Sequence, residues 1–492
     1  MTNLGRLPQR ADDQNSTSRR QRQRPAPRAL SSLSDALGDL FPRPRVRALE
    51  WARSKPLLAA AVQVAAVVVG AIVLLGRIPG TPAWDGIYAE DLGIFLRNAL
   101  QHPWQLLIPY AGYMQLLPQT LGQIAALLPL QDAAAFFAIT GALIASACAL
   151  FIFHASAGHI QSPVLRALLA LAVVLLPVAP LEIVDSGVNT PWYLMMALFW
   201  AILWQPRTRA GMALAAAIAF LTVTSNTLAV VFAPLLLLRI IALPRWREHA
   251  VTIGFTLGAL AQAPYVLGFV HGAGTRVSKL GKPGLSLSFY AHRVVLPTVG
   301  WHLSWFLRDH LGLNTATAIV AILLIIVFGW ALITRPWPVR LFVATALVTG
   351  FVFSIVATTV SYWVAGTPNS LGAEAGSRYT NLPILLFQAA AIVAVDWWPR
   401  GHPPRGSHAR DTGGRGARAG TRAVAAVGAL TVVLAIGWVS DYRYFGNRSH
   451  VQVWPTTSAE WLKSCQESTT GFIHVNLGGG TSGNIPCANI NP

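Results

Sequence analysis

Charged side chains are scarce in this chain. Only 11% of its 492 residues are Asp, Glu, Lys or Arg, whereas a soluble domain carries roughly a quarter. Hydrophobic residues make up 54% of the sequence. This composition excludes an ordinary soluble protein and predicts that most of the chain lies in lipid.

The sequence also lacks the pattern of a secretory signal peptide in its first 56 residues, so none is expected. The first 56 residues are polar and arginine-rich, with no apolar core before a small-residue cleavage site. We therefore expect this segment to stay on the chain, with residues 1–28 disordered and attracted to anionic lipid. Apolar residues then recur at helical spacing, which fits either a short helix in the membrane interface or a stiff linker. They are Leu30, Leu33, Leu37, Leu40 and Phe41.

Apolar runs of about the 17 to 25 residues that cross a bilayer recur from Leu57 onward. Arginine, proline or a polar cluster closes each run. The sequence thus predicts an all-α polytopic membrane protein with about eleven transmembrane helices. The predicted spans lie near residues 57–77, 133–153, 164–183, 189–204, 210–226, 227–243, 250–270, 314–334, 341–365, 380–398 and 423–441.

The net charge of +18 is unevenly distributed. If the N-terminus is cytoplasmic, most Lys and Arg residues fall in cytoplasmic segments, as the positive-inside rule requires. This distribution argues against a nucleic-acid partner and predicts an external C-terminus. Arginine far outnumbers lysine and alanine is abundant, as GC-rich coding produces, which favours a bacterial plasma membrane. The basic cytoplasmic loops are 205–209, 239–249, 334–340 and 400–422.

The spans divide the chain into a basic cytoplasmic tail (1–56), a transmembrane domain (57–441) and a small external tail (442–492). The first external loop, residues 78–132, contains two apolar stripes at helical spacing, which predict two amphipathic helices on the membrane surface. The stripes are Leu92, Phe95, Leu96, Ala99 and Leu100, then Met114, Leu117, Leu121, Ile124 and Leu128.

The external tail contains two of the three cysteines, Cys465 and Cys487. An oxidising exterior permits these two to form a disulfide, whereas Cys148 lies in an apolar span and is expected to be inert. Trp454 and Trp461 are expected to be anchors on the membrane surface or on carbohydrate.

Acidic residues gather at the external ends of two spans. The first loop carries Asp85, Glu90 and Asp91 within one short stretch, where they call for a cation, a metal or an acceptor hydroxyl. Alternatively, Glu90 and Asp91 only stabilise the first turn of the helix that follows. A second pair, Glu182 and Asp185, closes the third span and either converges with the first set on one pocket or is solvated loop charge.

Basic residues gather in the external loop 271–313, against the positive-inside trend. Arg276, Lys279 and Arg293 are expected to hold an anion there, with a lipid-linked phosphate as the first candidate. The simpler alternative is unspecific attraction to anionic headgroups. Arg378, followed by Tyr379 just before the tenth span, is expected to join this phosphate site because an arginine fork binds two phosphate oxygens at once.

The order of these elements resembles the GT-C superfamily of membrane glycosyltransferases. The stretches 89–95 (AEDLGIF) and 109–113 (PYAGY) are similar to bacterial members of this superfamily. The resemblance covers residues 57–400 and implies a polyprenyl-phosphate sugar donor, with Asp91 or Glu90 as catalytic base. It also implies that Glu182 and Asp185 bind the acceptor or a metal. The first loop lacks an Asp-x-Asp triplet, so the resemblance leaves the base and a possible divalent cation open.

These expectations combine into a glycosyltransferase that acts on an external glycan or lipid-linked acceptor by direct displacement. The base accepts the proton of the acceptor hydroxyl while Arg378 and the loop arginines stabilise the departing lipid phosphate. The alternatives are a transporter or flippase of lipid-linked glycans or lipids, an acyl- or phosphotransferase, and a nonenzymatic scaffold. A transporter needs ionisable groups within its spans, whereas here they lie at span ends.

Overall fold

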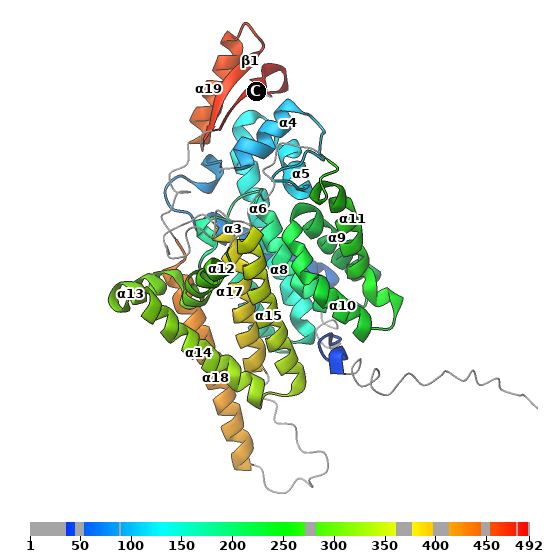
Figure 1. Ribbon diagram of the computed structural model, residues 1–492, viewed down its shortest axis with the longest axis vertical. Helices are drawn as coiled ribbons and strands as arrows, with labels where there is room; N and C mark the ends of the chain where they lie inside the picture. The colour runs from blue at the N-terminus through cyan, green and yellow to red at the C-terminus, as the bar shows by residue number, and fades with distance from the viewer. Residues whose placement is uncertain are drawn as a thin grey trace, which may run out of the picture.

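The structure, a computed structural model, describes residues 36–44, 54–87, 90–270, 282–360, 376–396, 413–443, 453–478 and 481–490. Within these ranges the chain is almost entirely helical, apart from one β-hairpin at the C-terminal end (Figure 1). The α-helices are α3 (Pro56–Leu75), α4 (Arg97–Gln101), α5 (Leu116–Ala125), α6 (Ala133–Ala155), α7 (Pro163–Val174), α8 (Thr190–Leu203), α9 (Arg209–Ser225), α10 (Ala233–Ala242), α11 (Ala250–Val266), α12 (Pro283–Tyr290), α13 (Trp301–Leu311), α14 (Leu313–Thr334), α15 (Trp337–Val360), α17 (Arg378–Asp396), α18 (Gly413–Ser440) and α19 (Trp454–Glu467).

Six of the described helical segments are long and apolar enough to cross a membrane. They are Pro56–Leu75, Leu130–Gly158, Pro163–Leu181, Leu313–Thr334, Trp337–Val360 and Arg378–Asp396. Four shorter apolar helical segments accompany them: Thr190–Leu203, Arg209–Ser225, Thr227–Ala242 and Val424–Ser440. The predicted all-α membrane protein is therefore confirmed, while the count of eleven spans stays a prediction.

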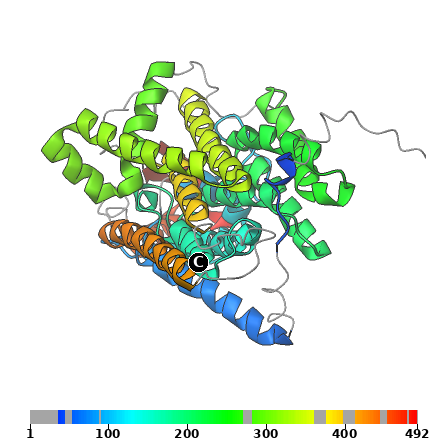
Figure 2. The same cartoon turned by 90° about the horizontal axis from the view of Figure 1, so that it is seen from below.

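Helix α8 lies at the centre of the bundle. All of its residues from Thr190 to Leu203 are buried, and α6, α9 and α17 pack around it. In contrast, α3 runs along the outer edge of the body, where its exposed side chains include Val64, Val69 and Ile72 (Figure 2). An exposed apolar stripe on a helix of spanning length is suited to contact with lipid tails rather than water.

The first loop folds as two short helical units, in the region where the stripes predicted surface helices. The first unit joins a π-helical turn, η2 (Asp91–Leu96), to α4, and the second is α5. Leu92, Phe95 and Leu96 of the first stripe are buried, because this face packs against α5 and the C-terminal module described next.

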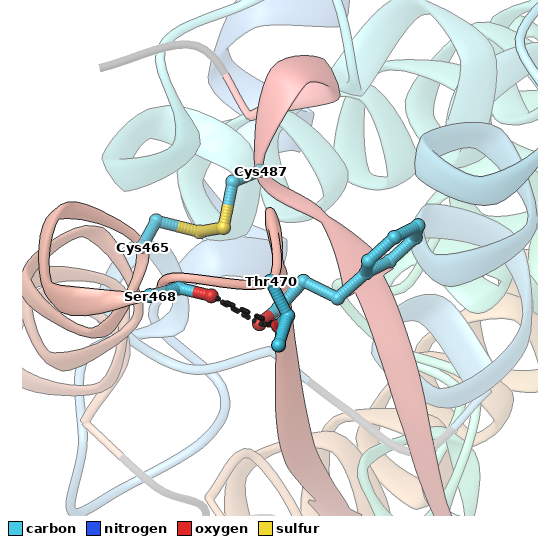
Figure 3. Close-up of a disulfide and its surroundings, with 5 residues drawn as sticks. Cys465, Ser468, Thr470 and Cys487 are labelled. Atoms are coloured by element: carbon cyan, nitrogen blue, oxygen red, sulfur yellow. Dashed lines mark hydrogen bonds between the residues drawn. A yellow bond between two sulfur atoms is a disulfide. The ribbon is translucent and has the colours of Figure 1, made fainter.

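The C-terminal module consists of α19 and the antiparallel hairpin β1 (Phe472–Gly478) and β2 (Thr481–Pro486). A disulfide joins Cys465 on α19 to Cys487 just after β2 (Figure 3). The expectation that Trp454 and Trp461 are surface anchors is wrong, since they are 0% and 6% exposed and fill a small core shared with the first loop. There Trp454 Nε1 donates to the Leu130 carbonyl at 2.8 Å, which satisfies its one donor.

Residues 36–44, which we call the strap, dock against the opposite end of the bundle from the C-terminal module (Figure 1). Leu40 and Phe41 are buried, and their carbonyls pair with His159 Nε2 at 3.0 Å and with Gln205 Nε2. Residues 36–38 form a short helical turn, but Leu40 and Phe41 contact protein, so the expected placement in the membrane interface is wrong for these two residues. Residues 30–35 lie outside the described residues. The cause is that Leu40 and Phe41 find an apolar protein site between helix ends.

Candidate functional site

Two carboxylates and one guanidinium from distant parts of the sequence meet at the end of the bundle nearest the first loop. Arg378 Nη1 lies 3.1 Å from Glu182 Oε1 and 3.7 Å from Glu90 Oε1. The side chains are 16%, 8% and 22% exposed for Arg378, Glu182 and Glu90, respectively. We call these three residues the charge cluster. Glu90 is its most accessible member and has the looser contact with Arg378.

Glu182 holds Arg378 in two ways. Its Oε2 accepts from the Arg378 backbone N–H at 2.9 Å and from Ser377 Oγ at 3.2 Å, so it caps the first turn of α17. Its Oε1 pairs with the guanidinium of the same residue. A carboxylate at a helix N-terminus is also favoured by the helix dipole. The predicted convergence of the first and second acidic loops therefore occurs for Glu90 and Glu182.

Asp91 has a different environment from its neighbour Glu90. It is 1% exposed, and its carboxylate accepts from Ser186 Oγ at 2.7 Å, from the Gly187 N–H at 3.1 Å and from the Val188 N–H at 2.7 Å. Three donors to one carboxylate stabilise its ionised form and occupy the lone pairs that a base needs. This arrangement favours a role for Asp91 in joining the first loop to the loop before α8.

The junction of these loops requires glycine at two positions. A Cβ on Gly187 would meet Phe137 at 2.6 Å and the Asp91 carboxylate at 3.1 Å. A Cβ on Gly141 of α6 would meet the Ser186 backbone at about 3 Å, a distance that real Cβ atoms barely tolerate. The backbone donors of Asp91 are thus held closely between two helices.

Charged residues of the site flank or occupy the two π-helical turns of the described chain. Glu90 and Asp91 lie at the start of η2, and Arg293 lies in η8 (Ala291–Val295). π-Helical turns are rare and occur frequently at functional sites. Arg293 is buried with its guanidinium 5.0 Å from the Phe289 ring centre. Burial lowers its pKa to about 10, and the charge of Glu182 opposes this shift.

Aromatic side chains border the charge cluster. The Arg378 guanidinium lies 5.5 Å from the Tyr379 ring centre, and Tyr379 packs edge-on against Trp192 with ring centres 5.2 Å apart. Burial raises the pKa of Tyr110, with the charge of Glu90 as the second cause, whereas Arg378 opposes the shift. The predicted residue Tyr379 is therefore beside Arg378, and Tyr110 faces the same charges.

A tight turn presents Tyr110 and the nearby Tyr113 to the cluster. Their backbones exchange two hydrogen bonds at 3.0 and 3.2 Å, and the two residues between them are left-handed, with φ of 53° at Ala111 and 81° at Gly112. Two left-handed central residues define a type I′ hairpin turn, and alanine adopts this conformation reluctantly. Sequence reasoning assigned no role to these tyrosines, although the resemblance rests partly on residues 109–113.

Other predicted site residues lie elsewhere. Asp185 is buried with a left-handed φ of 54°, and its charge acts on Arg77. Arg77 was missed by the sequence reading; it is buried and donates to the carbonyls of Val174 and Leu176 at 2.9 Å each. Asp85 lies in the short helix η1 (Ala83–Asp85), which packs against α6. Arg276 and Lys279 lie outside the described residues.

Ligands for a metal ion are not gathered in the described part of the chain. No group of three or more His, Cys, Asp and Glu side chains lies within reach of one ion there. A divalent cation stays a prediction from the resemblance.

Fold and site together define a helical membrane protein with a charge cluster at one end of its bundle. No known family model, characterised protein or solved structure matches this chain. The function must therefore be argued from the residues themselves.

Proposed function

We propose that this protein is a GT-C-type glycosyltransferase that moves a sugar from a polyprenyl-phosphate donor to a cell-envelope acceptor. The observation that supports this most is the charge cluster of Glu90, Glu182 and Arg378 at the end of an apolar helical bundle. A lipid-linked donor explains the combination, because its chain stays in the bilayer while its charged head reaches the helix ends.

The proposed reaction is a single displacement at the anomeric carbon. The acceptor oxygen attacks this carbon while Glu90 takes the proton of the hydroxyl. The bond from the anomeric carbon to the phosphate oxygen breaks, and the lipid phosphate leaves with the electron pair. Arg378 and Arg293 supply positive charge where the leaving group develops negative charge.

We assign the three acidic residues of the cluster region different tasks. Glu90 is the base because it is the most accessible and least committed carboxylate. Glu182 is a positioning residue that holds Arg378, and Asp91 is a positioning residue that fixes the loop before α8. Asp91 was the other base candidate, and its three donors are the reason for preferring Glu90.

The topology belongs to the same proposal. Eleven spans with a cytoplasmic N-terminus would place the charge cluster and the C-terminal module outside a bacterial plasma membrane. The disulfide between Cys465 and Cys487 supports this sidedness, since disulfides persist in oxidising compartments.

The first prediction tests the base. Glu90→Gln should lower the rate of sugar transfer by about 100- to 10,000-fold, the usual contribution of general base catalysis, with little effect on folding. The measurement is transfer from a panel of radiolabelled polyprenyl-phosphate sugars to cell-envelope fractions. Asp85→Asn is the matched control, because Asp85 lies in the same loop against α6. Full transfer by Glu90→Gln would rule out Glu90, and no transfer from any donor by the unaltered protein would oppose the proposed function.

A further inference from the structure

Arg166 is a buried cation without a partner, and it lies far from the charge cluster, at the end of the bundle where the strap docks. It closes the first turn of α7 and is 7% exposed. Its side chain forms no hydrogen bond or ion pair with any described residue, and its Nε is buried. A cation in the first turn of a helix is also disfavoured by the helix dipole. Both effects cost free energy, which an anion bound at this guanidinium would recover.

The groups around Arg166 hold it in place without neutralising it. Its guanidinium lies 4.7 Å from the ring centre of Phe153 on α6. Asp396, the last residue of α17, also reaches this junction, and its two oxygens accept from the Gln161 N–H at 2.9 Å and the Ser162 N–H at 3.1 Å. Asp396 thus caps the start of α7 and forms no ion pair with Arg166. Among the described residues nothing accepts from the guanidinium, so its N–H donors are left for a ligand.

This guanidinium lies at the depth of lipid headgroups. The segments Leu130–Gly158 and Pro163–Leu181 are both long and apolar enough to cross a membrane, and residues 159–162 connect them. A connection this short must lie at one membrane surface. It also contacts the strap, because His159 Nε2 pairs with a strap carbonyl at 3.0 Å. Arg166, one turn into the second segment, is therefore close to the strap-side surface of the bilayer.

The exposed side of α6 leads to the same place. Ile139, Ala147 and His154 lie along this side, and each is exposed. The His154 ring is 5.2 Å from that of Phe153, which in turn contacts Arg166. On a helix of spanning length, an exposed apolar side faces lipid tails. A lipid whose acyl chain lies along it would have its headgroup beside His154 and within reach of the guanidinium.

We propose that Arg166, flanked by His154, binds the phosphate of an anionic phospholipid at the strap end of the bundle. The two free oxygens of a phosphodiester match the fork of a guanidinium. Basic pockets between transmembrane helices bind anionic headgroups in this way. The acyl chains distinguish this ligand from a soluble phosphate, because they would contact the exposed side of α6. The site is separate from the charge cluster, and the proposal does not depend on sugar transfer.

The test is thermal unfolding of the purified full-length protein in dodecyl maltoside, with and without added lipid. Dioleoyl phosphatidylglycerol should raise the unfolding temperature of the unaltered protein, and zwitterionic dioleoyl phosphatidylcholine should raise it less. In Arg166→Gln, the apparent affinity for phosphatidylglycerol should fall about 10- to 100-fold, the loss of a charge-assisted contact. Without lipid, Arg166→Gln should be at least as stable as the unaltered protein, because it removes a charge that has no partner.

The matched control is Arg209→Gln. Arg209 is also an arginine in the first turn of a helix at the strap end, but it is exposed. This variant should respond to phosphatidylglycerol like the unaltered protein. Arg166→Lys keeps the charge without the fork, so it should retain part of the preference for phosphatidylglycerol, and it serves if Arg166→Gln fails to fold.

Three results would overturn the proposal. The first is an equal response of the unaltered protein to phosphatidylglycerol and phosphatidylcholine. The second is a loss of stability in Arg166→Gln that is the same with and without lipid, since this would show that the arginine acts only through its packing on Phe153. The third is stabilisation by inorganic phosphate that equals that by phosphatidylglycerol and depends on Arg166, which would replace the lipid by a soluble anion. Sugar transfer enters none of these measurements, so failure of the glycosyltransferase proposal would leave them unchanged.

Discussion

Arg239 and Arg378 are both largely buried, one at each end of the helical bundle, and different partners compensate their charges. At the strap end, Arg239 donates to the backbone carbonyls of Trp204 at 3.0 Å and Glu248 at 2.6 and 2.9 Å. At the site end, Arg378 faces the side-chain carboxylates of Glu182 and Glu90. Helix α8 extends from one end to the other, since the loop before it contacts Asp91 and Trp204 follows its last residue.

This difference separates a structural arginine from one suited to chemistry. A carbonyl partner is fixed by the fold, so Arg239 joins the ends of α8, α10 and the loop before α11 permanently. A carboxylate partner has its own charge and can be protonated or exchanged for a substrate group. Arg378 at the site end can therefore change partners, whereas Arg239 at the strap end cannot.

The largest effect should come from removing a fixed partner at the site end. Glu182→Ala deletes the closer carboxylate of Arg378 and the cap of α17, and it should cost about 3–5 kcal/mol, the usual result of leaving a buried charge without its partner. The measurement is thermal unfolding in detergent, followed by tryptophan fluorescence.

A double variant sharpens this prediction. Glu182→Ala combined with Arg378→Met removes both charges and should regain much of the lost stability, because replacing a whole buried pair by apolar groups is often close to neutral. If the double variant is as unstable as Glu182→Ala alone, capping of α17 rather than the ion pair is the dominant contribution.

A somewhat smaller effect is expected at the strap end. Phe41→Ala removes a buried ring that also lies 5.6 Å from the Arg239 guanidinium, and it should weaken docking of the strap by about 3 kcal/mol. Opening can be measured by maleimide labelling of Leu40→Cys in a Cys148→Ser background. When the strap opens and closes faster than the maleimide reacts, the labelling rate is proportional to the population of the open state. A loss of about 3 kcal/mol should then accelerate labelling about 100-fold.

The control for this experiment is Asp39→Ala, which alters an exposed strap residue. It should leave the labelling rate unchanged. Equal rates with and without Phe41→Ala would show that the strap is not held by this ring. Sugar transfer from the donor panel should not change in either variant, because the strap and the site lie at opposite ends of α8.

The sequence could predict those features that depend on composition and local spacing. Apolar run length identified the membrane protein, and of the two alternatives for the acidic sets, convergence is found for Glu90 and Glu182. The different roles of Glu90 and Asp91 could not be predicted from the sequence. The two adjacent carboxylates differ only in the folded protein, where residues 186–188 donate hydrogen bonds to Asp91. Burial of Phe41 and Trp454 could not be predicted from the sequence either, because the spacing of apolar residues shows an apolar face but not whether lipid or protein covers it.

The smallest effect is a pH dependence of the strap, and it concerns His159. Its Nε2 donates to the Leu40 carbonyl, its ring lies 4.9 Å from that of Phe342, and its Nδ1 is buried without a partner. Burial lowers the pKa of His159 from 6.5 to about 4, although the hydrogen bond to Leu40 opposes the shift. We expect undocking of the strap to admit water to the ring and to return its pKa toward 6.5, so this contribution to docking is fully present above pH 6.5 and is lost as the pH falls toward 4. At pH 5.5, one unit below the ordinary pKa of histidine, the loss of docking free energy is about 1.4 kcal/mol.

Labelling of Leu40→Cys, normalised to a free thiol at the same pH, should therefore rise about tenfold between pH 7.5 and 5.5. His159→Gln retains a donor for the Leu40 carbonyl without a titrating ring and should abolish the rise; a flat profile in the unaltered histidine background would show that His159 does not control the strap.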